Sequence, residues 1–308
     1  MRRFPYQVCP NPELPPPTSL LVDRPLQGIF LVCLGTVLLA GSDAAAKYLN
    51  EIMSPIAIAW TRYAVYAAIM AVVVQRKGIS SLRTQRPVLQ LARGLFALAS
   101  AVCFITSVKY LPLAEATAVT FIAPMFVTLL AVAILSEVVG WHRWAALVVG
   151  FVGVLIIVRP GYGTFEPAFL WPIGAALFWA AVTVITRMIA GVETAITTVA
   201  WSAVAGFLAV TALWLWTGPT LPGPAAIAIG AIVGVLATAG QWLVVISSRY
   251  AEASALAPFT YTQLFWSCVL GYYVFNAIPD GWAIVGMIPI ILSGLYMTYR
   301  ERLRTKRH

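Results

Sequence analysis

Three charged residues interrupt long apolar runs early in this 308-residue chain: Asp43, Lys47 and Arg62. Asp43 and Lys47 are four residues apart, so on a helix their side chains share one face. A charge is costly to bury in an apolar segment, and such residues usually serve a function. Two interpretations fit them. Asp43 can take up and release a proton, which would couple proton movement to the activity of the protein. Alternatively, these charges can form a structural ion pair near the outer membrane boundary.

A proline lies in the middle of the apolar stretch "PLAEATAVTFIAPM", residues 112–125. Pro124 has no N–H, so the carbonyl of Thr120 loses its usual helical partner. In hydrocarbon this carbonyl must bond a neighbour or face a watered cavity. The sequence therefore predicts either a kink that lines a pathway or a structural bend supported by a hydroxyl side chain.

The same stretch begins with Glu115, and a similar stretch downstream, "RYAEASALAPFTYTQ", contains Glu252 and Pro258. A carboxylate at the start of a helix interacts favourably with the helix dipole. Glu115 and Glu252 can therefore be helix caps at the membrane surface. The alternative interpretation makes Glu115, Glu252 and Pro258 parts of two gates, with Glu115 on the outer side and Glu252 on the inner side.

Aromatic and amide side chains gather in the second half of the chain. Trp and Tyr near the ends of membrane spans usually form interfacial belts, but Trp179, Tyr261 and Trp266 lie further from the ends. They can form a stacking wall for a planar solute, or they can pack as ordinary helix contacts. The candidate wall comprises Trp179, Gln241, Trp242, Tyr261, Gln263, Phe265 and Trp266.

The residue types that most enzymes need are sparse. The four cysteines, Cys9, Cys33, Cys103 and Cys268, are scattered without metal-ligand spacing. The two histidines, His142 and His308, accompany no nucleophile or paired carboxylates. No glycine loop typical of phosphate binding is present. We expect no enzyme activity, no metal and no cofactor.

The composition indicates an all-α integral membrane protein. The chain is 61% hydrophobic and 10% charged, with a mean hydropathy of +0.87, and its apolar runs are near the ~20 residues that span a bilayer. The Pro-rich segment "PNPELPPPTS" indicates a disordered tail over residues 1–25. The predicted spans are 26–49, 54–75, 88–108, 113–135, 141–159, 168–189, 195–217, 224–247, 252–275 and 281–299.

The cations indicate an orientation with both termini in the cytoplasm. Sixteen Lys and Arg residues then lie inside, Arg93 and the basic tail 300–308 among them, and three lie outside. The three outside are Lys47, Lys109 and Arg159. The net charge of +9 therefore requires no nucleic acid, and the basic tail is expected to contact anionic lipid.

The chain contains an internal repeat. Residues 114–118, "AEATA", match residues 251–255, "AEASA", and Lys47 corresponds to Arg187. Trp141, Gly153 and Arg159 recur at the same spacing as Trp282, Gly294 and Arg300. Each unit holds five spans, an odd number, so the second unit enters the membrane inverted. Residues 26–160 and 168–299 are the two predicted repeats, an architecture typical of secondary transporters.

These runs resemble the EamA-type transporters of the drug/metabolite transporter superfamily. "AEATAVTFIAPMFVTLLAVAILSE", "GFVGVLIIVRPG" and "AEASALAPFTYTQLFWS" carry the resemblance, which extends from about residue 25 to 300. It implies ten helices around a central cavity, with spans 5 and 10 at the periphery. It also implies alternating-access movement of small organic solutes; known members include amino-acid exporters and riboflavin uptake proteins.

Two departures from the family pattern stand out. Many members carry a Gly-Glu pair after span 9, whereas this chain has "FNAIPDGW", so the counterpart of Glu137 is Asn276 or Ala277. The second repeat also lacks the proline of the first: the repeat spacing sets Tyr261 at the place of Pro124, and the proline has moved to Pro258. The two gates are therefore expected to differ chemically.

Together these features predict a secondary transporter in a bacterial inner membrane, either a monomer or a homodimer. Its expected solute is a small organic metabolite, amino-acid-like or planar and aromatic. A multidrug exporter is the main alternative, and a deep unpaired carboxylate facing the cavity would favour it. A membrane-embedded enzyme is the third interpretation. The expected pathway comprises Asp43, Arg62, Thr120, Pro124, Trp179, Gln241, Tyr261, Gln263 and Trp266.

Overall fold

The computed structural model describes residues 24–137, 139–159, 167–218, 222–247, 250–251 and 253–305. All regular secondary structure in these ranges is helical. The predicted tail over residues 1–23 and the candidate gate residue Glu252 lie outside them. The helices and 3₁₀ turns are α1 Pro25–Leu49, α2 Pro55–Lys77, η2 Ile79–Leu82, α3 Pro87–Tyr110, α4 Leu113–Thr120, α5 Ala123–Leu135, α6 Trp141–Val158, η3 Pro167–Phe169, α7 Leu170–Ile189, α8 Ala195–Trp216, α9 Pro224–Ser247, α10 Ala253–Thr260, α11 Thr262–Phe275 and α12 Gly281–Thr305.

Eight segments of the described chain are long and apolar enough to cross a membrane. They are α1, α2, α3, α4 together with α5, α6, η3 together with α7, α8, and α9, and the protein is therefore an all-helical membrane protein. The last predicted span is longer than expected, because α12 continues through Arg300 to Thr305. Residues 281–297 of α12 form a shorter apolar helix.

Local sequence explains where several helices begin. Pro55, Pro87 and Pro224 are the first residues of α2, α3 and α9, where a missing N–H removes no helical hydrogen bond. The Ser54 hydroxyl accepts from the N–H of Ala57 at 3.2 Å and so caps α2. Helix α8 has an equivalent cap at its own start, residue Thr194. These caps satisfy backbone donors that would otherwise be unpaired.

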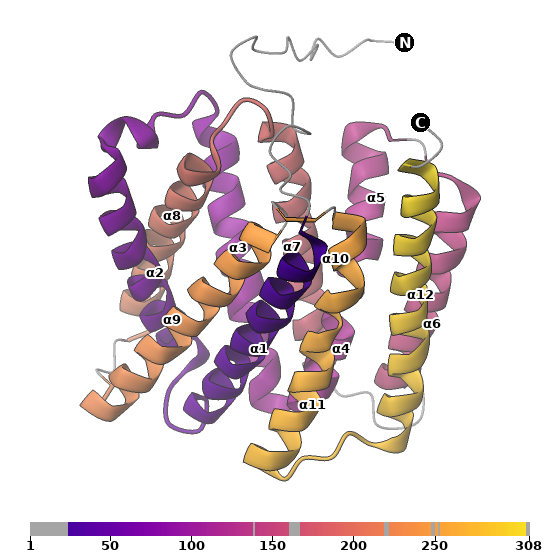
Figure 1. Ribbon diagram of the computed structural model, residues 1–308. Helices are drawn as coiled ribbons and strands as arrows, with labels where there is room; N and C mark the ends of the chain where they lie inside the picture. The colour runs from indigo at the N-terminus through magenta and orange to yellow at the C-terminus, as the bar shows by residue number, and fades with distance from the viewer. Residues whose placement is uncertain are drawn as a thin grey trace.

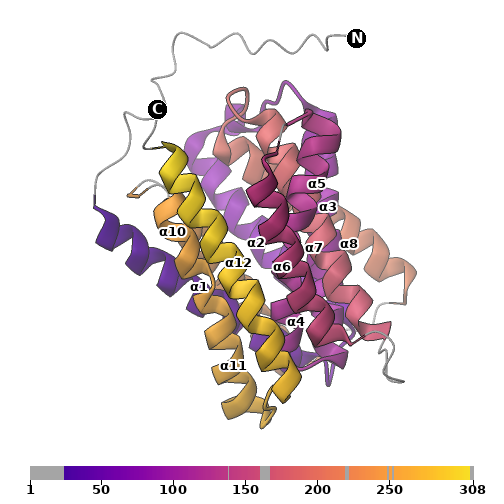
Figure 2. The same ribbon diagram turned by 90° about the vertical axis from the view of Figure 1, so that its right-hand side faces the viewer.

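The helices pack in pairs that lie far apart in sequence. Helix α1 packs against α9, α3 against α7, and α2 against α8. Helices α6 and α12 lie side by side, at the right-hand edge of the bundle in Figure 1 and in front of it in Figure 2. The start of α1 and the end of α12 lie at the same end of the molecule (Figure 1).

Two predicted spans are broken into two helices each. The segment 113–135 is interrupted between α4 and α5, where Ile122 donates through its N–H to the carbonyl of Val119 at 3.1 Å in a tight turn. The segment that was expected to run from 252 to 275 is interrupted between α10 and α11, at Tyr261. The kink predicted near Pro124 is therefore present, and a second break occurs that the sequence did not predict.

The helix bounds give the spacing between corresponding points of the chain. The first residues of α4 and α10 are 140 residues apart, and so are their last residues. The last residues of α5 and α11 are also 140 residues apart. The match between "AEATA" and "AEASA" had suggested a shorter spacing, with Tyr261 at the place of Pro124. The spacing of 140 instead pairs Tyr261 with Phe121, because both residues lie at the breaks rather than at a proline.

Glycines permit the closest approach of α1 and α9. A Cβ atom at Gly35 would lie 2.9 Å from the Gly240 carbonyl oxygen and 2.9 Å from Val244 Cγ2. Gly41, on the same helix, faces more space: its Cβ would meet only Leu236 Cδ1, at 3.7 Å. The backbones of α1 and α9 therefore touch near Gly35 but not near Gly41.

This difference predicts unequal effects of two alanine substitutions on α1. Gly35→Ala should lower the free energy of unfolding by ~1–3 kcal/mol, because overpacking pushes the helices apart. Gly41→Ala should be neutral or stabilising by up to ~1 kcal/mol, because alanine favours the helix. Thermal unfolding of the purified proteins in one detergent compares them. Equal melting temperatures would show that the contact between α1 and α9 is not tight.

Candidate functional site

A buried carboxylate joins α1 to one of the broken helices. Asp43 is 8% exposed, and its Oδ2 accepts a hydrogen bond from Gln263 Nε2 on α11 at 3.2 Å. Arg62 on α2 is an electrostatic neighbour of Asp43, yet the ion pairs found in the described ranges include neither residue. Asp43, Arg62 and Gln263 were all predicted pathway residues, and the structure brings them together.

Lys47 does not pair with Asp43. Its Nζ donates to the carbonyl oxygens of Val108 at 2.7 Å and Leu111 at 2.8 Å, at the end of α3. The ammonium also lies 5.6 Å from the centroid of the Phe275 ring. The ion-pair interpretation of Asp43 and Lys47 is therefore wrong: the cation compensates the negative end of a helix and its unpaired carbonyls.

A line of hydroxyl groups extends the contact around Asp43. Thr36 lies two turns before Asp43 on α1, and its Oγ1 is 2.7 Å from Thr262 Oγ1 on α11. One turn after Gln263 on α11, Ser267 accepts a hydrogen bond at its Oγ from the Thr117 hydroxyl of α4 at 3.2 Å. Helices α1, α4 and α11 thus meet through polar groups in an otherwise apolar bundle.

The two helix breaks touch each other. The rings of Phe121 and Tyr261 stack, with centroids 4.7 Å apart and planes 21° apart. At the first break the Thr120 hydroxyl donates to the carbonyl of Thr117 at 2.6 Å. At the second, the Thr262 hydroxyl donates to the carbonyl of Phe259 at 2.6 Å. A threonine hydroxyl thus donates to a backbone carbonyl at each break, and the stacked rings join both breaks.

The other predicted site residues differ in burial, and Pro258 adjoins the second break, where its carbonyl accepts from the N–H of Tyr261 at 3.4 Å. Trp179 is 42% exposed, and Gln241 and Pro124 are also exposed. Trp266 is half-buried and packs edge-on against Phe265 at 5.2 Å. Pro258 is a half-buried residue inside α10, and Glu115 lies in the first turn of α4. Their roles in the pathway or in gating remain predictions.

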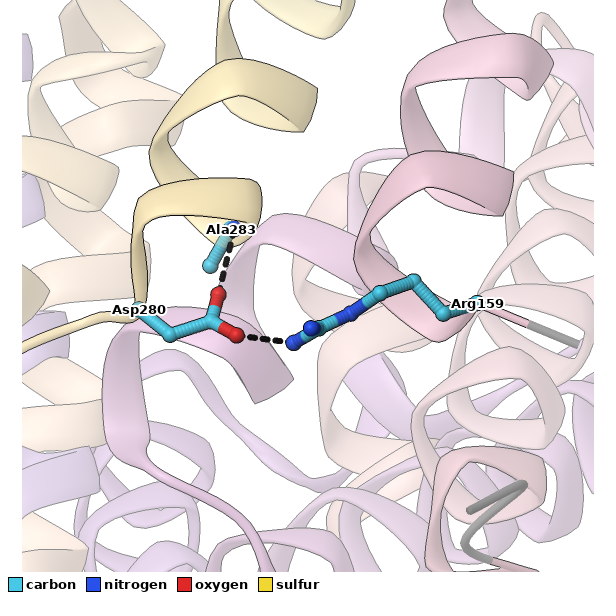
Figure 3. Close-up of polar contacts among 3 residues, drawn as sticks. All are labelled: Arg159, Asp280 and Ala283. Atoms are coloured by element: carbon cyan, nitrogen blue, oxygen red, sulfur yellow. Dashed lines mark hydrogen bonds and ion pairs between the residues drawn. The ribbon is translucent and has the colours of Figure 1, made fainter. Parts of the chain in front are cut away.

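Two ion pairs lie between helices at other places in the bundle. Arg159, at the end of α6, pairs with Asp280, whose Oδ1 accepts from the N–H of Ala283 at 2.6 Å and so caps α12 (Figure 3). Arg187 of α7 lies 3.7 Å from Glu137. Lys47 and Arg187 correspond in the repeat, but one contacts carbonyls and the other a carboxylate.

The sequence interpretation missed several polar residues. Arg93 was counted among the cytoplasmic cations, but it lies inside α3 and bonds to α7 and α8. Its place nearly two turns after Pro87, within an apolar run, could have indicated an intramembrane charge. Thr36 was also missed, although it lies seven residues before Asp43 and so shares its helix face.

The chain resembles known transporters along most of its length. The model of the EamA-like transporter family matches residues 26–159 and 167–299. An S-adenosylmethionine uptake transporter of Rickettsia prowazekii (strain Madrid E) is 28% identical over 90% of this chain and 94% of its own. A riboflavin transporter of Vibrio cholerae is 28% identical over 92% of this chain and 97% of its own.

Two weaker similarities complete the comparison. A pseudopaline exporter of Pseudomonas aeruginosa is 22% identical over 92% of this chain and all of its own. One solved crystal structure, 20% identical, superposes with a TM-score of 0.63 over 88% of this chain and 96% of its own. That similarity shows the same fold.

The contact of Lys47 predicts a role in stability. Lys47→Met should lower the free energy of unfolding by ~1.5–3 kcal/mol, because two charge-assisted hydrogen bonds to the end of α3 are lost. Lys109→Met is the matched control: it removes a lysine from the last turn of α3, where the side chain is exposed, and should change little. Thermal unfolding in detergent measures both. Equal effects would exclude the capping role of Lys47.

Proposed function

Because the chain belongs to the EamA-like transporter family and is a secondary transporter of small metabolites, we propose that it works by alternating access around Asp43. The observation that carries the proposal is the contact of Asp43 with Gln263, beside the break between α10 and α11. A charged side chain next to interrupted helices, at the contact between distant segments, is the usual arrangement of a transporter site.

We propose ten spans in two inverted repeats. The family model matches the chain twice, once in each half. The packing supports this, because α1 on α9 and α7 on α3 are the same contact with the halves exchanged. Ser136 and Asn276, 140 residues apart, both end their helices in the left-handed conformation, with φ of 53° and 49°. The next residue of the second half, Ala277, is thus the counterpart of Glu137.

The contact of the breaks supports a rocking movement of the two halves. Each break frees backbone groups and lets the two parts of a span change their angle, as helix interruptions do. Because Phe121 and Tyr261 stack, bending at one break shifts the ring that covers the other. Arg187 pairs with Glu137, whereas Lys47, its counterpart in the proposed repeat, donates to a carbonyl group. This difference supports two gates of unequal chemistry.

The proposed solute is a small organic metabolite, amino-acid-like or planar and aromatic. The relatives named for S-adenosylmethionine and riboflavin support this range, and they support a transporter over a membrane-embedded enzyme. Export of cationic compounds is the second candidate. The observation that favours it is that Lys47 contacts carbonyl groups, so it does not neutralise Asp43.

The proposed location is a bacterial inner membrane with both termini in the cytoplasm. In a cysteine-free background, Ser80→Cys should react with a membrane-permeant maleimide only, because residue 80 is expected inside. Thr220→Cys should react with an impermeant maleimide added to intact cells. Labelling yield on gels measures both positions. External labelling of residue 80 would contradict the ten-span topology.

Proton coupling through Asp43 predicts a split between two transport modes. In proteoliposomes, Asp43→Asn should abolish accumulation driven by a pH gradient but preserve solute exchange at equal pH, because only the titrating group is lost. Asp280→Asn is the matched control, since Asp280 pairs with Arg159 away from the site. Accumulation and exchange are measured in the same vesicles. An unchanged pH dependence of accumulation would remove Asp43 from the coupling mechanism.

A further inference from the structure

A third intramembrane cation, Arg93, crosslinks three helices through neutral groups. It lies about 9 Å along α3 from Pro87. Its Nε donates to Thr186 Oγ1 of α7 at 2.7 Å. Its Nη1 donates to the carbonyl of Thr198, at 3.4 Å, and to Ser202 Oγ, both on α8. Hydroxyl and carbonyl dipoles thus hold the guanidinium in a fixed orientation.

No carboxylate compensates this charge in the described part of the chain. The ion pairs found there join Arg159 to Asp280 and Arg187 to Glu137. A guanidinium has five N–H donors, and the described contacts use Nε and Nη1. Nη2 has no partner among the described residues, and it is not among the fully buried unpaired atoms. A cation that is largely withdrawn from water without a counter-charge is costly, which favours an anionic ligand.

A buried amide beside Arg93 is also incompletely bonded. Gln90, one helical turn earlier, is 0% exposed, and its Nε2 donates to Thr198 Oγ1 at 3.2 Å. Its Oε1 has no hydrogen-bond partner in the described residues. Turning the amide over lets the oxygen accept from the Thr198 hydroxyl and leaves an N–H₂ group free to donate. Gln90 and Arg93 then both have hydrogen-bond donors next to Thr198.

The donors of Arg93 and Gln90 lie near polar side chains of α2. The rings of Tyr63 and Tyr66 on α2 pack edge to face, with centroids 6.0 Å apart. Tyr66 donates through its hydroxyl to the carbonyl of Val199 at 3.1 Å, next to the residue that Arg93 contacts on α8. Polar groups of α2, α3 and α8 therefore meet at this place in the bundle.

We propose that Arg93 and Gln90 bind a carboxylate group of the transported solute. The proposal rests on the transport function above and narrows its solute class to metabolites with a carboxylate. A single negative charge fits better than a phosphate dianion, because only Nη2 of one guanidinium and one amide are free. In the proposed topology the site lies in the cytoplasmic half of span 3, whereas Asp43 lies in the outer half of span 1.

Two probes that differ in one carboxylate test this site: S-adenosylmethionine and its decarboxylated form. Equilibrium binding to the purified full-length protein and uptake into proteoliposomes are measured for both. The wild type should prefer S-adenosylmethionine. Arg93→Gln should weaken its binding about ten- to a hundredfold, as expected when a hydrogen bond to a charged group is lost, and should leave binding of the decarboxylated form nearly unchanged.

Further variants separate charge from structure. Arg93→Lys keeps the cation and should recover part of the binding. Gln90→Leu should weaken the binding of S-adenosylmethionine but not that of the decarboxylated form. This variant tests the carboxylate site if Arg93→Gln does not fold. Arg76→Gln, which removes an exposed arginine from the last turn of α2, is the matched control and should retain the preference.

The outcomes distinguish this site from the transport function. If the wild type binds both probes equally or binds neither, or if Arg93→Gln weakens both to the same extent, the carboxylate site is overturned. Uptake of riboflavin or decarboxylated S-adenosylmethionine without any preference would overturn the site and leave transport intact. Carboxylate-dependent binding without uptake of any probe would uphold the site and contradict the transport function.

Discussion

The breaks in two of the predicted spans, at Phe121–Ile122 and at Tyr261, impose the main physical constraint on this bundle. In hydrocarbon, backbone groups that leave the helical pattern must find partners within the protein. Tight turns and threonine hydroxyls provide these partners at both breaks. The two breaks also pack against each other, because the rings of Phe121 and Tyr261 stack.

Each charge inside the bundle is compensated differently, and the difference separates stability from function. Lys47 binds the carbonyls at the end of α3, so its charge is used within the fold. Asp43 accepts one hydrogen bond from an amide, and Arg93 donates only to neutral hydroxyl and carbonyl groups. The last two are compensated less completely, which supports the roles in proton coupling and solute binding proposed for them.

The two halves share their helix plan but not their polar contacts. Ser54 and Thr194 begin corresponding helices with the same cap. The cations that correspond in the repeat, Lys47 and Arg187, contact different partners. The proposed alternating access needs two states of similar energy. In that proposal, unequal contacts at the two ends favour one state until a solute binds.

The sequence by itself determined the helices, the family and the break near Pro124, because hydropathy, prolines and caps act over a few residues of chain. It could also identify Asp43 and Arg62 as unusual charges. Only the tertiary structure decided that Asp43 meets Gln263 rather than Lys47, that Tyr261 meets Phe121, and that Arg93 points into the bundle. The reason is that a side chain's partner on another helix depends on how both helices are rotated and shifted against each other, and local sequence spacing does not contain that information.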